Sequence, residues 1–209
     1  YNEKLVKILI NNIYKCGVIP VKMIQWGLPY MKLIKVNKDI INILENTYEK
    51  CPIHNLEYTK ELYNKDFYNK LDKDYDIIDI IGSGSIAQVY KIKDKKGKQY
   101  AMKVKHPNAH ADFRTIKFYL KIIFTILPFN KIFPISLSDF FNQFEEQLNF
   151  VNESNNMIKF RELYHNNNLF KIPKIYKLSK NIIIMEYIPG KSLDTIKNNI
   201  EHYKYHLYI

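Results

Sequence analysis

Two closely spaced turns between apolar segments constrain this chain more than any other feature. The first turn, residues 82–85, reads Gly-Ser-Gly-Ser and separates apolar residues at 77–81 from apolar residues at 86–92. The second turn, at residues 94–97, leads into residues 100–105, where Lys103 has Met and Val as neighbours. The pattern predicts a strand, a tight small-residue loop, a second strand, a hairpin turn and a third strand that carries a lysine.

The loop and the lysine together favour binding of a phosphate-bearing ligand. Gly82 and Gly84 let the backbone approach a ligand closely and offer N–H groups to phosphate oxygens. Lys103 needs an anionic partner, because burying an ammonium group alone is costly. Glycine loop, hairpin and Ala-x-Lys follow one another as in a kinase N-lobe, which covers ATP in this way. A glycine hairpin alone is also compatible with an ordinary turn.

Length and charge limit the function classes. The 209 residues suffice for one or two domains, and because the chain starts at Tyr1 we expect it to be a piece of a longer protein. A net charge of +11 favours nucleic acid or an anionic membrane as a partner. The lysines are scattered, however, and Arg114 and Arg161 are the only arginines, which argues against nucleic acid as a partner. A Lys-rich nucleic-acid-binding module remains the weaker alternative.

The cysteines and the most apolar segment carry little functional signal. Cys16 and Cys51 lack metal-ligand spacing, which favours thiols in a reducing compartment. The segment 118–127 is about half the length that a membrane span requires and contains Lys121. We interpret it as a core or interfacial helix.

The periodicity divides the chain into three parts. Residues 1–70 read as a helical N-terminal extension, residues 75–190 as a mixed lobe with its hinge, and residues 191–209 as the start of a second lobe. In the extension, Lys22 and Gln25 share a helical face, which from spacing alone is compatible with a solvated surface.

One long helix is expected from about residue 138 to 164, with Glu153 on it and Ser136 or Ser138 as its cap. Its predicted buried stripe comprises Phe140, Phe141, Phe144, Leu148, Val151 and Ile158. An apolar strand pair follows at residues 172–178 and 181–187. It ends in Glu186-Tyr187 and a Pro-Gly break, which is typical of a kinase hinge. The predicted fold class is therefore α+β, with an antiparallel sheet of about five strands.

Several of these motifs together resemble the AarF/UbiB (ABC-one type) atypical kinase-like family, which is implicated in ubiquinone metabolism. The loop at 82–90 resembles the family's small-residue loop, and residues 101–107 resemble its lysine strand. Residues 150–156 are similar to its Glu-Ala-x-Asn helix, and residues 22–25 to its Lys-x-Gly-Gln signature. The Gly-x-Gly loop and the tryptophan after Gln25 resemble the animal mitochondrial branch.

The resemblance implies a role for each site residue. Lys103 would neutralise the α- and β-phosphates of ATP or ADP, and Glu153 would hold it, while Lys22 and Gln25 would lie over the nucleotide site. The backbone of Gly82, Ser83, Gly84, Ser85, Ile86 and Ala87 would cover the phosphates. Val89 and Ala101 would sandwich the adenine, and Glu186 and Tyr187 would offer it backbone groups.

The resemblance also implies cofactors, partners and a location. No catalytic or metal set is complete in this chain, and the ligands for Mg²⁺ are expected beyond residue 209. Lipid or quinone and a membrane surface are the implied partners besides the nucleotide, with a mitochondrial or other membrane-associated location.

Two departures leave the activity open. Ile24 replaces the glycine of the Lys-x-Gly-Gln signature, and Gln147 and Asn149 replace the two acids of a Glu-x-Asp motif. An amide loses the charge-assisted bond that a carboxylate would make, and Glu145 or Glu146 would compensate only from a different helical face. The leading hypothesis is an ATP-binding small-molecule kinase or ATPase, of which this chain lacks the catalytic loop. The alternative is a non-catalytic nucleotide-binding or lipid-associated scaffold.

Overall fold

A computed structural model describes residues 3–15, 18–45, 51, 53–126, 136–167 and 169–190. Its helices are α1 (Glu3–Lys15), α2 (Val18–Leu33), α3 (Lys38–Glu45), α4 (Leu56–Phe67), α5 (Leu71–Asp74), α6 (Ala109–Ile126), α8 (Leu137–Leu148) and α9 (Phe150–Leu163). Its strands are β1 (Tyr75–Ser83), β2 (Ala87–Asp94), β3 (Gln99–Lys105), β4 (Ile175–Leu178) and β5 (Ile182–Glu186).

The strands form one antiparallel sheet with the order β1-β2-β3-β5-β4. The β2–β3 turn has Gly97 at φ +86°, a conformation that glycine adopts without steric cost. In β3, Lys103 lies opposite Val89 on one side and Ile183 on the other, so the lysine is in the middle of the sheet. The predicted α+β fold with about five antiparallel strands is confirmed.

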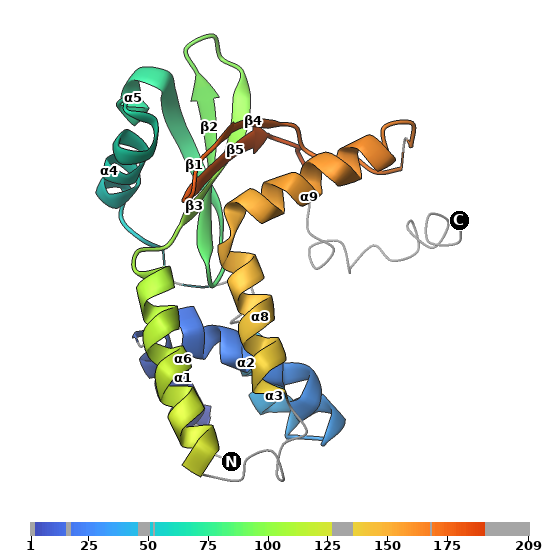
Figure 1. Ribbon diagram of the computed structural model, residues 1–209. Helices are drawn as coiled ribbons and strands as arrows, with labels where there is room; N and C mark the ends of the chain where they lie inside the picture. The colour runs from blue at the N-terminus through green and yellow to red at the C-terminus, as the bar shows by residue number, and fades with distance from the viewer. Residues whose placement is uncertain are drawn as a thin grey trace.

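The two faces of the sheet have different coverings. Successive side chains in a strand point to opposite faces. One face packs against α4 and α5 and buries Tyr63, Leu71, Tyr90, Ile92, Tyr100, Met102, Val104, Ile182 and Ile184. Val89 and Lys103 belong to the opposite face, where α9 crosses near β4 and β5 (Figure 1).

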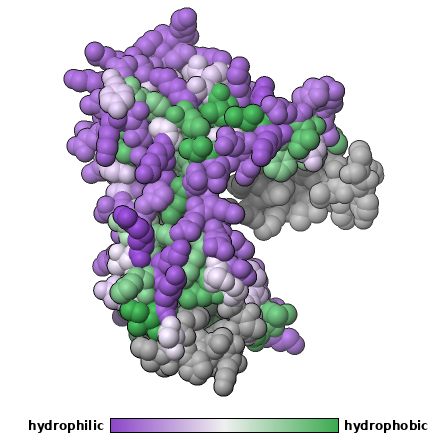
Figure 2. All heavy atoms as spheres, in the orientation of Figure 1, coloured by the Kyte–Doolittle hydropathy of each residue, from purple (hydrophilic) through white to green (hydrophobic). Residues whose placement is uncertain are grey.

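The other helices lie together below the sheet in Figure 1. Helices α1, α2 and α3 share a small core made of Ile10, Leu28, Ile41 and Leu44. A larger core joins α6 and α8 to the glycine loop, through residues that include Phe113, Phe140, Phe144, Ile86 and Ala87. Figure 2 shows hydrophilic side chains over most of the upper part of this face, with apolar side chains visible in its middle and again over the lower helices.

The helix predicted from about residue 138 to 164 is in fact two helices. Asn149 ends α8 and begins α9, with the extended backbone angles φ −94° and ψ 90°. Its side chain accepts hydrogen bonds from the N–H groups of Val151 and Asn152, each at 3.1 Å. An asparagine that caps the first turn of a helix in this way stabilises a new start, so the single-helix prediction was wrong. The predicted cap of the first half is confirmed, because Ser136 accepts from the N–H of Asp139 at 3.2 Å.

The break changes which residues are buried. Phe140, Phe141, Phe144 and Leu148 are buried as predicted. Val151 and Ile158, which were expected to continue the stripe, are 44% and 45% exposed. The two residues belong to α9, which runs in a new direction along the sheet (Figure 1).

The predicted domain limits at residues 70, 75 and 190 stay predictions, and residues 191–209 lie outside the described residues. Helix α4, which falls within the predicted extension, packs on the sheet through Tyr63. Among the described residues, no helix combines the length and the apolar character that crossing a membrane requires.

Candidate functional site

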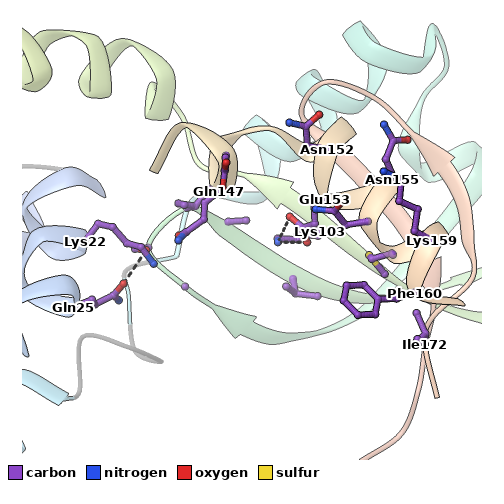
Figure 3. A pocket seen from close by; sticks show the side chains of 18 residues that line it. Lys22, Gln25, Lys103, Gln147, Asn152, Glu153, Asn155, Lys159, Phe160 and Ile172 are labelled. Atoms are coloured by element: carbon purple, nitrogen blue, oxygen red, sulfur yellow. Dashed lines mark hydrogen bonds and ion pairs between the residues drawn. The ribbon is translucent and has the colours of Figure 1, made fainter. Parts of the chain in front are cut away.

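A cavity of about 1200 Å³ lies beside the glycine loop. Its walls come from α2, the loop, the central strands, the end of α8, α9 and the segment before β4 (Figure 3). Six of the residues that line it are Lys22, Gln25, Ser85, Val89, Lys103 and Glu153. The structure therefore brings together residues that are far apart in the sequence, from Lys22 to Ile172.

Lys103 and Glu153 form an ion pair at the centre of the cavity wall. The Lys103 Nζ atom lies 2.6 Å from Oε1 and 2.8 Å from Oε2 of Glu153 (Figure 3). The ring centre of Phe150, at the first turn of α9, is 5.0 Å from the same ammonium group. The pair joins β3 to α9, and both side chains keep part of their surface open to the cavity.

Helix α2 brings Lys22 and Gln25 to the opposite side of the same cavity (Figure 3). Gln25 is only 6% exposed, and its Oε1 accepts a hydrogen bond from Ser85 Oγ at 3.3 Å. Burial lowers the pKa of Lys22, and the nearby Lys103 ammonium lowers it further. The solvated-surface alternative for these two residues is therefore wrong. With Lys159, three lysines face this cavity against Glu146 and Glu153, so an anion is favoured there.

Carbonyl groups at both ends of the glycine loop accept hydrogen bonds from other parts of the protein. The carbonyl of Ser83 accepts from the Cys51 N–H at 3.2 Å, and that of Ile86 accepts from the His106 N–H at 2.9 Å. The Gly84 N–H donates to the Ala87 carbonyl at 3.0 Å, so this amide closes the loop. It is not the open phosphate donor that we expected.

The loop leaves room where the glycines lie. A Cβ atom added to Gly82 would meet no atom within 4 Å, and one added to Gly84 would meet the Ala87 carbonyl oxygen at 3.9 Å. Neither glycine is required by a neighbouring protein atom or by a positive φ angle.

Several predicted site residues lie outside the cavity lining. Gly82 and Ser83 are paired with β2 in the sheet, and Ala101 is buried between β2 and β5. The Glu186 N–H donates to the Lys174 carbonyl at 2.8 Å, and the Glu186 carboxylate is 3.3 Å from Lys171 Nζ. The Tyr187 ring lies 4.4 Å from Lys91 Nζ. The Glu186 amide is thus occupied within the protein.

The remaining predicted residues line the cavity, and some lining residues were missed. Gly84, Ile86 and Ala87 lie at its edge as expected. Asn156, Met157 and Phe160 also line it. They follow Glu153 by three, four and seven residues, so the helical repeat from Glu153 was a usable signal for them.

The two departures from the acidic motif have different outcomes. Gln147 lines the cavity, so a neutral amide lies where the resemblance predicts a carboxylate. Asn149 is not part of the lining and serves as the cap of α9. Glu146 lines the cavity although we expected it on a different helical face, because α8 ends two residues after it. Glu145 instead pairs with Lys117 at 2.8 Å.

Cys51, the one cysteine among the described residues, interacts electrostatically with Lys22 of this site. Burial raises the pKa of its thiol to about 11, and Lys22 opposes that shift. Cys16 lies outside the described residues. Within the described part of the chain, no group of three His, Cys, Asp or Glu side chains is arranged to hold a metal ion.

A five-stranded antiparallel sheet, a helix joined to its central lysine by an ion pair and a small-residue loop define a kinase-like N-lobe. The sequence matches the description "ABC1 atypical kinase-like domain" over residues 46–207. The chain belongs to this family, as the resemblance predicted. Its assignment to the mitochondrial branch stays a prediction.

Curated relatives share about a quarter of their residues with the chain. The "ABC1 family protein MCP2 homolog" of Schizosaccharomyces pombe is 27% identical over 175 residues, which cover 80% of this chain and 31% of that protein. The "AarF domain-containing kinase 1" of Drosophila melanogaster is 25% identical, over 78% of this chain and 33% of that protein. The chain thus spans about a third of the length of these relatives.

The fold is also similar to a solved structure, the complex of Rv3197 with erythromycin from Mycobacterium tuberculosis. The TM-score is 0.58 at 19% identity, and the match covers 71% of this chain and 39% of that chain. This similarity concerns the fold alone.

Proposed function

We propose that this chain is the nucleotide-binding lobe of an atypical kinase or ATPase that acts on a small molecule. The single observation that carries the proposal is the Lys103–Glu153 pair in the wall of a cavity next to the glycine loop. A paired lysine of this kind can hold the α- and β-phosphates of ATP while the carboxylate fixes its position.

The cavity has the size and charge for a nucleotide. Pockets for small ligands enclose roughly 300–1000 Å³, so a cavity of about 1200 Å³ can accept ATP. Lys22 and Lys103 approach it from opposite walls, and each would gain from an anion between them. Val89 offers an apolar surface on the β2 side.

Each residue has a defined task in this proposal. Lys103 would donate to phosphate oxygens, Glu153 would hold the ammonium in place, and Gln25 would hold the loop through Ser85. Bound Mg²⁺ would supply charge neutralisation on the phosphates. The described residues show no cluster that would hold it, and ligands beyond residue 209 stay a prediction.

The proposed class of substrate rests on the family. The match to the ABC1 atypical kinase-like description and a relative named as a kinase support phosphate chemistry. From the resemblance, we extend the proposal to lipid or quinone metabolism and a membrane surface as a partner.

The test is titration of Mg-ATP into the full-length protein, followed by heat denaturation, because a ligand that binds the native state raises the unfolding temperature. Loss of a charge-assisted hydrogen bond costs about 1.5–3 kcal/mol, so Lys103→Ala should weaken ATP binding by about 10- to 100-fold. Lys93→Ala removes the same charge from an exposed position on β2 and should leave affinity unchanged. Absence of any ATP-dependent shift in the wild type would refute the proposal.

A second candidate is a nucleotide-binding scaffold without catalysis. The observation that favours it is Gln147, whose amide lines the cavity near Lys22 in place of a carboxylate. ATP hydrolysis or transfer by the full-length protein, lost in Lys103→Ala, would exclude the scaffold. The scaffold would be established if the wild type bound ATP tightly without turning it over and Gln147→Glu gained ATP turnover.

A further inference from the structure

A buried row of side chains behind the glycine loop leads directly to one of its carbonyl groups. His106 Nε2 lies 2.9 Å from the Gly84 carbonyl oxygen, and His106 Nδ1 lies 2.8 Å from His54 Nδ1. His54 Nε2 lies 2.9 Å from Thr59 Oγ1, which is 2.8 Å from the hydroxyl of Tyr90. His54 also has its backbone N–H fixed, by Gln88 Oε1 at 2.8 Å.

Burial favours the neutral form of both imidazole rings in the row. Burial lowers the pKa of His106, although its bond to Gly84 opposes the shift. Burial and then the neighbouring His106 lower the pKa of His54 to about 4. A neutral imidazole has one nitrogen that donates and one that accepts.

The direction of every hydrogen bond then follows from the carbonyl at the end. A carbonyl oxygen can only accept, so His106 Nε2 donates to Gly84 and His106 Nδ1 must accept. His54 Nδ1 is therefore the donor between the two rings, and His54 Nε2 accepts from the Thr59 hydroxyl. Thr59 in turn accepts from Tyr90, which completes a row in which each group has one task.

His106 holds the loop at two points. Its backbone N–H donates to the Ile86 carbonyl at 2.9 Å, two residues beyond the carbonyl that its ring holds. His106 is 8% exposed and does not belong to the cavity lining. The His106 ring contacts His54, and His54 contacts Tyr90. Because Tyr90 follows Val89 in β2, the row lies on the sheet face opposite that of Val89 and Lys103.

The hydrogen bond from His106 fixes the orientation of the peptide group between Gly84 and Ser85, which lies next to the cavity. The described peptide bonds are all trans, so the carbonyl and the N–H of one peptide group point in opposite directions. When His106 holds the Gly84 carbonyl on one side, the Ser85 N–H must point to the other side. Ser85 lines the cavity there.

We propose that His106, fixed in one tautomer by His54, is a positioning residue that aims the Ser85 amide of the glycine loop at a phosphate group of the nucleotide. This inference rests on the proposed function, because it names how that site would recognise phosphate. It assigns to residues 54 and 106 a task that concerns the phosphates and not the nucleoside.

The test compares two amide substitutions of His106 in the full-length protein. Glutamine places an N–H donor near the position of Nε2, so His106→Gln keeps the bond to Gly84 and loses that to His54. Asparagine places its oxygen near Nδ1, so His106→Asn keeps the partner His54 and loses Gly84. Tyr90→Phe removes the hydroxyl at the far end of the row and leaves the loop bond in place.

Affinities for Mg-ATP and for adenosine are measured by calorimetric titration. A buried hydrogen bond contributes about 1 kcal/mol, so His106→Asn should weaken ATP binding by about five- to tenfold, and His106→Gln and Tyr90→Phe by about twofold or less. Adenosine affinity should stay unchanged in all three variants, because adenosine carries no phosphate. Equal losses for the two amides, or a parallel loss for adenosine, would overturn the inference while leaving nucleotide binding intact.

Two further results separate the remaining cases. A wild type that binds adenosine and ATP equally well, or neither of them, refutes the phosphate task; binding of neither also refutes the proposed function. If His106→Asn does not fold, ¹⁵N NMR of the wild-type histidines decides. A proton on Nε2 of His106 and on Nδ1 of His54 supports the row, and the reverse tautomers contradict it.

Discussion

Helices α8 and α9 are consecutive and similar in length, yet α8 buries an apolar stripe in the core whereas most side chains of α9 are exposed or face the cavity. Helix α8 buries Phe140, Phe141, Phe144 and Leu148 against the other lower helices and the loop. Helix α9 buries Phe150 and Ser154 among its described side chains, and much of its remaining surface is exposed or faces the cavity. Most of the buried apolar residues of this stretch thus lie before Asn149, and most of its cavity-lining residues lie after it, although Glu146 and Gln147 at the end of α8 also line the cavity.

The largest expected effect is on the stability that α8 provides. Phe144→Ala should lower the free energy of unfolding by about 3–5 kcal/mol, because it removes a ring that is buried against Phe113 and Phe140. Phe160→Ala is the matched change on α9, where the ring is 52% exposed, and should cost about 1 kcal/mol or less. Urea denaturation of the full-length protein measures both. Similar losses for the two variants would break the comparison.

An intermediate effect is expected at the junction. Asn149→Ala removes the acceptor of two backbone N–H groups and should cost about 1 kcal/mol. Asn149→Asp keeps an acceptor at the start of α9 and should be neutral or slightly stabilising, because a negative charge is favourable at a helix N-terminus. The same denaturation measurement checks this prediction. An equal loss in both variants would show that Asn149 does not act as a cap.

The smallest effect is expected for the residue that we had placed in the buried stripe. Ile158→Ala should change the free energy of unfolding by about 0.5 kcal/mol or less, since Ile158 is largely exposed on α9. Leu148→Ala, at the buried end of α8, should cost about 2–5 kcal/mol. A decrease of more than about 2 kcal/mol in the free energy of unfolding for Ile158→Ala would instead support one buried stripe that continues from α8 into α9.

The sequence allowed prediction of features that follow from local pattern. The strand around Lys103 and the glycine loop were predictable from apolar runs and turn residues. Glu153 was singled out from the other helix acids only by the resemblance of residues 150–156 to the family's helix. The break at Asn149 left a signal that we underweighted. Asparagine is a strong cap residue, but helical periodicity on both sides favoured one long helix.

Other features depend on contacts between distant residues and left no pattern to read. His54 and His106 lie 52 residues apart, and their pairing arises from the meeting of the α4 entry with the end of β3. The Glu186 side chain contacts Lys171, and its backbone N–H donates to the Lys174 carbonyl, because β5 pairs with the edge strand β4 and the segment before it. Neither strand alone shows which of its polar groups the partner will occupy.

The bend at Asn149 has a mechanical consequence for the cavity. On one side of the bend, Phe140 of α8 packs against Trp26 of α2, the helix that carries Lys22. On the other side, Glu153 of α9 is paired with Lys103. A small rotation about the backbone bonds of Asn149 would change the distance between Lys22 and Lys103 while both helices remained intact. The width of the cavity would therefore change with the backbone torsion angles of Asn149, a residue that does not line it.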